Sequence, residues 1–200
     1  MEFIIDLIAE RSVLRESLRG IIWTIFFNRL FGPITPVTNE FMNITYPSAN
    51  NLPDLNSLIN DRIDRFIHYL IKTTMTRGKL IVQFLSKNNN TKKAGWFGNS
   101  TYNNKEEFKV WEVWCINVEM LPVDETSTNL TQSIQSFENN MTKVYDIVDR
   151  YKDHIPPITS LDSAPFPYKI LIPEPNNPEQ QLYIQEGEEG WGSYIKKILD

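Results

Sequence analysis

The segment between Leu130 and Tyr151 constrains the fold more than any other part of the chain. Its apolar residues recur at alternating steps of four and three, the spacing of one face of an α-helix. These residues are Leu130, Ile134, Phe137, Met141, Val144, Val148 and Tyr151. Polar residues fill the positions between them, so the pattern predicts a helix that buries one stripe against another element.

Two earlier segments show the same periodicity. From Ser12 onward, apolar residues recur at three- and four-residue steps until Gly32 and Pro33, which are expected to stop the helix. A second helix is expected to begin near Asp54, a good N-cap residue. The predicted apolar faces are Leu14, Leu18, Ile21, Ile22, Ile25 and Phe26 in the first helix, and Leu55, Leu58, Ile59, Ile63, Phe66, Ile67 and Leu70 in the second.

Apolar and β-branched runs around these helices predict strands. The longest run is 109–121, and the others are 3–8, 41–46, 79–86 and 168–172. Single-striped helices alternating with strands predict an α+β fold in which helices cover one face of a sheet.

The 200 residues suffice for one domain and a tail. We place the domain at 1–172 and the tail at 173–200. The tail is rich in proline and glutamate and too polar to bury much surface, although 191–199 has the spacing of a short helix.

Charge and hydropathy exclude several classes of function. A formal net charge of −5 disfavours nucleic acid and anionic membranes as partners. The first residues lack the basic region of a signal peptide, and the longest apolar stretch, 21–27, is too short to span a bilayer. We therefore expect a cytoplasmic protein with unused glycosylation sequons at Asn43, Asn99, Asn129 and Asn140.

Few residues could support catalysis or bind a metal. The single cysteine, Cys115, lies in an apolar run, where a packed thiol is expected rather than a nucleophile. His68 and His154 are too isolated to form a structural zinc site with it. We expect no catalytic residue, no metal and no cofactor, and a hydrolase with an unrecognised site is the remaining enzymatic alternative.

The polar loop 87–108 contains two aromatic residues, Trp96 and Phe97, between Gly95 and Gly98. The rings either fold back into the core or form an exposed finger, where a tryptophan anchor contributes about 2 kcal/mol or more to binding. The residue types alone leave both possibilities open. The basic residues near the two rings are Lys87, Lys92, Lys93 and Lys105. We interpret them as the charges of a solvated loop rather than as a nucleic-acid or membrane surface.

An ordered series of segments resembles the autophagy-related protein 101 family. In that family a loop with a neighbouring Trp and Phe, called the WF finger, runs into a strand that reads PWEVW or close to it. This chain has Trp96 and Phe97, followed by the strand sequence WEVW at 111–114. It departs from the family in having no residue between Trp96 and Phe97 and in having Val110 where a proline can occur. The likeness covers roughly 1–172, is strongest over 92–121, and includes similar segments at 22–29, 41–46 and 167–170.

The resemblance implies a HORMA fold, with three helices packed on an antiparallel sheet and a mobile C-terminal segment. It also implies a non-catalytic scaffold of the autophagy-initiation kinase complex at the phagophore assembly site. Such a scaffold pairs with the HORMA domain of autophagy-related protein 13 and recruits downstream autophagy factors through Trp96 and Phe97. The alternative is a HORMA adaptor of the checkpoint or chromosome type, which clamps a partner peptide, and the proline-rich acidic tail disfavours it.

Overall fold

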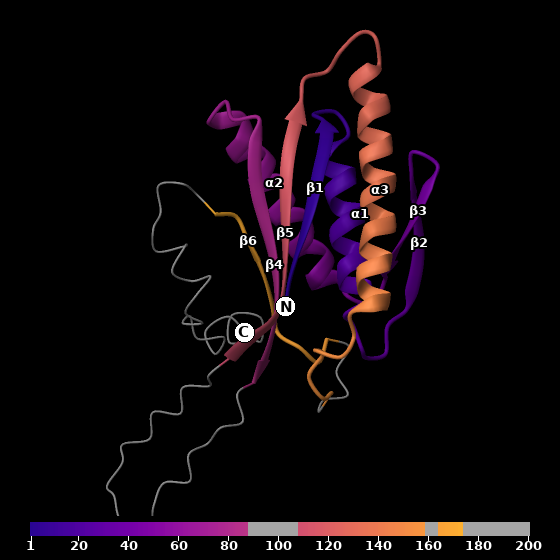
Figure 1. The fold of residues 1–200 in the computed structure, drawn as a ribbon, viewed down its shortest axis with the longest axis vertical. Helices are drawn as coiled ribbons and strands as arrows, with labels where there is room; N and C mark the ends of the chain where they lie inside the picture. Colours follow the sequence, from indigo (N-terminus) through magenta and orange to yellow (C-terminus); the bar gives the residue numbers. More distant parts are fainter. Residues whose placement is uncertain (88–107, 159–163, 174–200) are drawn as a thin grey trace, which may run out of the picture.

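Three helices and a four-stranded sheet enclose the core in the computed structural model, which describes residues 1–87, 108–158 and 164–173 (Figure 1). The architecture is the predicted α+β class and is consistent with the HORMA fold. The elements in chain order are β1 (Glu2–Glu10), α1 (Leu14–Phe27), β2 (Pro36–Phe41), β3 (Ile44–Ala49), α2 (Pro53–Lys72), β4 (Arg77–Lys87), β5 (Phe108–Leu121), α3 (Thr128–Arg150) and β6 (Tyr168–Leu171).

The four-stranded sheet has the order β1-β5-β4-β6. β4 is antiparallel to both of its neighbours, whereas β1 is parallel to β5, so the sheet is mixed. A parallel pair needs a crossover connection, and the chain between β1 and β5 supplies one through α1, the β2–β3 hairpin, α2 and β4. The antiparallel expectation therefore holds for the pairings of β4 but not for that of β1.

The β2–β3 hairpin replaces the single strand that the sequence predicts at 41–46. Phe41 ends β2 and Ile44 begins β3, and the turn between them consists of Met42 and Asn43. Both turn residues have positive φ angles, 51° and 61°, as the commonest two-residue hairpin turns require. The apolar run therefore lies across a turn, and its central residues do not belong to a strand.

The predicted apolar stripes face the core. Every position predicted on the face of the first helix is fully buried in α1. On α2 the buried positions are Leu55, Ile59, Ile63, Phe66 and Leu70, and on α3 they are Phe137, Met141, Val144 and Val148. Alternate residues of the strands complete the core from the sheet side, and they include Ile5, Leu7, Val82, Trp114 and Ile116.

α1 and α3 approach each other closely at Gly20. A Cβ atom at this position would lie 2.7 Å and 2.9 Å from two ring carbons of Phe137 and 3.3 Å from Tyr46. Phe137 is fully buried and packs edge-on against Phe41, with ring centroids 5.4 Å apart. Glycine is therefore the residue that permits this helix spacing.

Polar side chains of α3 form hydrogen bonds with the backbone groups on the outer edge of β1, along which α3 runs (Figure 1). The backbone N–H groups of Ile8 and Glu10 donate to Ser136 Oγ (2.9 Å) and Ser133 Oγ (2.7 Å). Asn140 Nδ2 donates to the carbonyl of Asp6 at 2.9 Å. Asn140 is thus a buried packing residue, although it begins a glycosylation sequon.

Candidate partner-binding site at the base of the Trp-Phe loop

Trp96 and Phe97 lie outside the described residues, but both ends of their loop are described. Lys87 is the last residue of β4 and pairs with Phe108, the first residue of β5. In Figure 1 the ends of these two strands extend below the rest of the sheet. The loop that carries Trp96 and Phe97 therefore begins and ends on two paired strands.

The sheet narrows to two strands before it reaches the loop. The β6 pairing ends at Phe84, followed by one hydrogen bond from Leu85 N to the carbonyl of Pro167 (2.7 Å), and the β1 pairing begins at Val113. Among the described residues, only β4 and β5 pair with each other beyond these points. We call residues 85–87 paired with 108–110 the ribbon.

A β-bulge lies where the ribbon joins the sheet. Phe84 pairs with Glu112 and Leu85 pairs with Val110, so Trp111 is the extra residue. A bulge bends its strand and increases the local twist, and it can redirect the side chains around it. The direction of the ribbon is therefore set at Trp111 and Glu112.

The Glu112 carboxylate is fully buried and accepts hydrogen bonds from three side chains. Arg29 Nε lies 2.8 Å from Oε1 and 3.0 Å from Oε2. Trp114 Nε1 donates to Oε1 at 2.5 Å, and His154 Nε2 lies 2.6 Å from Oε2. A carboxylate only accepts, so Nε2 of His154 carries the proton in this contact. We call Arg29, Glu112, Trp114 and His154 the Glu112 cluster.

Aromatic rings pack around the cluster. The ring of Trp111 lies 5.6 Å from that of His154 and 5.1 Å from that of Phe166. The ring of Phe3 lies 4.8 Å from Trp114 and 6.0 Å from His154. The WEVW segment therefore contributes buried residues to the base of the loop.

Glu112 was absent from the residues singled out in the sequence, although its strand pattern signals a role. Successive residues of a strand face opposite sides, so Glu112 lies on the same face as Trp114 and Ile116. A carboxylate on such an apolar face needs a partner. Nothing local indicates that the partners are Arg29 and His154, which are distant in the sequence.

Cys115 and His68 do not form a catalytic pair. Cys115 lies on the opposite face of β5 from Glu112, and its thiol donates to Glu2 Oε1 at 3.3 Å. Burial, together with the hydrogen bond to Glu2, raises the pKa of this thiol to about 11, which disfavours the nucleophilic thiolate. His68 is exposed on α2.

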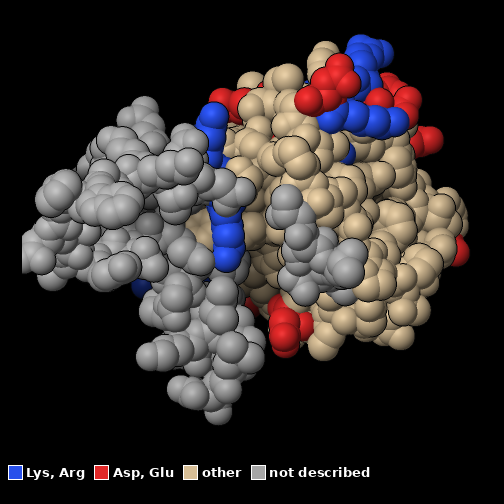
Figure 2. Space-filling model, turned by 90° about the horizontal axis from the view of Figure 1, so that it is seen from below, with Lys and Arg blue, Asp and Glu red and all other residues tan. Residues whose placement is uncertain are grey.

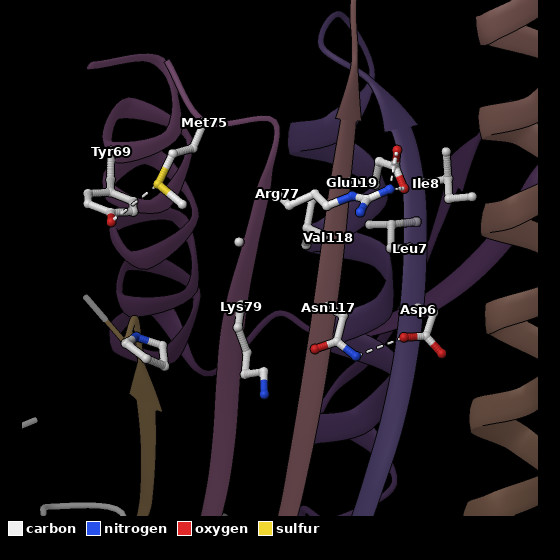
Figure 3. Close-up of a pocket in the computed structure, with 12 residues that line it drawn as sticks. Asp6, Leu7, Ile8, Tyr69, Met75, Arg77, Lys79, Asn117, Val118 and Glu119 are labelled. Carbon is white, nitrogen blue, oxygen red and sulfur yellow. Dashed lines mark hydrogen bonds and ion pairs between the residues drawn. The ribbon is translucent and has the colours of Figure 1, made fainter. Parts of the chain in front are cut away.

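A surface groove of about 500 Å³ lies at the far end of β4 and β5 from the loop (Figure 3). Tyr69 and Met75 line it from the end of α2 and the turn that follows. Across the strands, Asn117 Nδ2 donates to Asp6 at 2.8 Å, and Arg77 bonds both carboxylate oxygens of Glu119 at 3.1 Å. These polar groups are thus bonded to one another across the strands, and Lys79 lines the groove beside them.

The described ranges contain no group of three or more His, Cys, Asp or Glu residues that could hold a metal ion. No helix in them is long and apolar enough to cross a membrane. Figure 2 shows few charges over most of the described surface seen from below, with basic side chains next to the undescribed residues. Lys87 and Lys109 are exposed at this end of the strands.

Comparison with known proteins identifies relatives along most of the chain. The model of the family described as "Autophagy-related protein 101" matches residues 6–162. A protein named autophagy-related protein 101 from Arabidopsis thaliana is 28% identical over 191 residues, covering 84% of this chain and 84% of the relative. One of the same name from Schizosaccharomyces pombe is 24% identical over 185 residues, covering 92% of this chain and 86% of the relative.

Proposed function

The chain belongs to the autophagy-related protein 101 family and so has a role related to autophagy, and we propose that it acts there as a non-catalytic scaffold. It heterodimerises with the HORMA domain of autophagy-related protein 13 within the autophagy-initiation kinase complex. It recruits downstream autophagy factors through an exposed finger formed by Trp96 and Phe97. Its place of action is the cytoplasm, at the phagophore assembly site.

The family match over residues 6–162 is the observation that carries this proposal. The match runs from β1 past the end of α3 and includes the whole loop between β4 and β5. The loop begins and ends on two paired strands whose ends extend below the rest of the sheet, and this supports a role in presenting two aromatic rings to another protein (Figure 1). The family assignment also favours the autophagy scaffold over the HORMA adaptor of the checkpoint type.

Co-expression with the HORMA domain of autophagy-related protein 13 tests the heterodimer. We expect a one-to-one complex in gel filtration at micromolar concentration. Its melting temperature should exceed that of either part, because a partner that binds only the folded state stabilises it. Two separate peaks would contradict the partner assignment.

The finger is tested by replacing Trp96→Ala and Phe97→Ala together. If the rings face solvent, the free energy of unfolding should change by less than about 1 kcal/mol and the heterodimer should persist. Autophagic flux in cells should nevertheless fall. Trp114→Ala is the matched control for a buried ring and should cost about 3–5 kcal/mol. A comparable loss in the double variant, or normal flux, would remove the recruitment role from Trp96 and Phe97.

A further inference from the structure

We propose that Glu112 is a positioning residue that fixes the direction in which the ribbon leaves the sheet, and that Arg29 and His154 hold it in place. The inference rests on the proposed function in one respect, namely that the loop 88–107 is the partner-binding element. It assigns a role to a buried charged cluster that otherwise contributes only to packing.

The bulge lies where the sheet becomes a ribbon. Among the described residues, β4 and β5 pair only with each other past the bond from Leu85 to Pro167. Two-stranded ribbons twist more strongly than wider sheets. A rotation at the bulge would therefore change the direction of both ribbon strands.

Glu112 is placed to prevent that rotation. It follows the extra residue of the bulge directly, and its carboxylate is held from two other parts of the fold. Arg29 comes from the segment after α1, and His154 comes from the segment after α3. Arg29 also donates to the carbonyl of Tyr151 at 3.4 Å, which joins the two holding segments to each other.

The cluster also specifies the register of the two strands. A slip of one residue along β5 would turn Glu112 to the opposite face of the sheet. The slip would leave the buried guanidinium of Arg29, whose side chain is 2% exposed, without its carboxylate. Because an unpaired buried charge is strongly unfavourable, the ion pair selects one register and one bulge position.

β1 fixes the opposite edge of the same short stretch of β5. The carbonyl of Met1 accepts from Val113 N at 2.9 Å, and the amino group of Met1 donates to the carbonyl of Trp111 at 2.9 Å. The backbone on both sides of Glu112 is therefore held by β1 while its side chain is held by Arg29 and His154. This arrangement makes Glu112 the fixed point from which the ribbon extends.

The test measures the ribbon directly. Nitroxide labels at Lys109→Cys and Tyr145→Cys, both exposed positions, in a Cys115→Ala background, report the distance from the ribbon to α3 by pulsed electron resonance. Hydrogen exchange of the backbone amides in 85–87 and 108–110 reports opening of the ribbon. Glu112→Gln keeps the shape of the side chain and removes its charge. Glu119→Gln, the same substitution in an exposed ion pair on the same strand, is the control.

We expect Glu112→Gln to broaden the distance distribution and to accelerate amide exchange in the ribbon by at least about tenfold, while Glu119→Gln leaves both unchanged. Glu112→Gln leaves the buried charge of Arg29 without its ion-pair partner and could unfold the domain. A second variant therefore combines Arg29→Met with Glu112→Leu. Replacing both charges by apolar groups of similar size avoids the unpaired charge. The folded double variant should show the same broadening and faster exchange, and wild-type values in it would overturn the inference.

The outcomes separate this inference from the proposed function. If the ribbon loosens in the Glu112 variants but Trp96→Ala with Phe97→Ala leaves autophagic flux normal, Glu112 keeps its positioning role and the finger loses its recruitment role. If the aromatic variant abolishes flux while the Glu112 variants leave the distance and exchange unchanged, the finger role stands and the positioning role is wrong.

Discussion

Replacing Gly20 by alanine should destabilise the domain, although alanine is the better helix former. Two effects oppose each other at this position. In a helix interior, alanine is favoured over glycine by about 1 kcal/mol. Against that gain, the new Cβ would lie 2.7 Å and 2.9 Å from ring carbons of Phe137, closer than real Cβ atoms approach.

The surroundings of Phe137 decide whether Gly20→Ala raises or lowers the stability of the domain. Its ring is fully buried and packed against Phe41, so it cannot turn aside into solvent. Overpacking of a close-packed core costs about 1–3 kcal/mol. After the helix gain of about 1 kcal/mol is subtracted, the net loss should be up to about 2 kcal/mol. For a chain of this size that corresponds to a melting temperature lower by up to about 8 °C.

Thermal and urea unfolding followed by circular dichroism would measure the loss. Phe137→Leu removes the ring that meets the new Cβ, so Gly20→Ala should be less harmful in that background than in the wild type. A double-mutant cycle isolates this coupling. A higher melting temperature for Gly20→Ala alone would refute the close approach of α1 and α3 from which the loss is calculated.

Three further outcomes follow from the fold and the sequence. Cys115 should resist alkylation at pH 8 and react faster as pH rises toward its folded-state pKa of about 11. Because that pKa is raised above the ordinary value of 9.0, the contribution of the buried thiol to stability should be complete below about pH 9 and lost as pH rises to about 11, which urea titrations at several pH values would measure. Deletion of 174–200 should leave a domain that still melts cooperatively, whereas loss of the transition would mean that the tail belongs to the sheet. Asn140→Ala should lower the free energy of unfolding by about 0.5–1.5 kcal/mol, because it removes the part-buried hydrogen bond to the carbonyl of Asp6, and an unchanged urea midpoint would contradict that role.

The helices were predictable because their periodicity is a local property of the sequence. Every apolar position predicted in α1 is buried, and the α3 pattern ends at Tyr151, the C-cap residue. The parallel pairing of β1 with β5 was not predictable from the strand patterns, because pairing partners are set by tertiary contacts. The hairpin turn at Met42 and Asn43 was missed because the apolar residues on its two sides form one continuous run.

The candidate site was likewise predictable from the sequence only in part. The loop and its two aromatic residues were predictable from composition, since Trp96 and Phe97 contrast with their polar neighbours. The Glu112 cluster was not predictable, because Arg29 and Glu112 are distant in the sequence and only the fold brings them together. His154 appeared isolated in the sequence, and its partner lies 42 residues away.

The hydrogen bonds from β1 to α3 also bear on how copies of this chain behave toward one another. A bare strand edge can template the addition of another molecule, and successive additions build a polymer. Here the hydroxyls of Ser133 and Ser136 occupy the N–H groups through which β1 would recruit a second chain. At high protein concentration, covering this edge disfavours the addition of further copies of the chain. Loss of these hydroxyls should therefore appear as concentration-dependent self-association before it appears as unfolding.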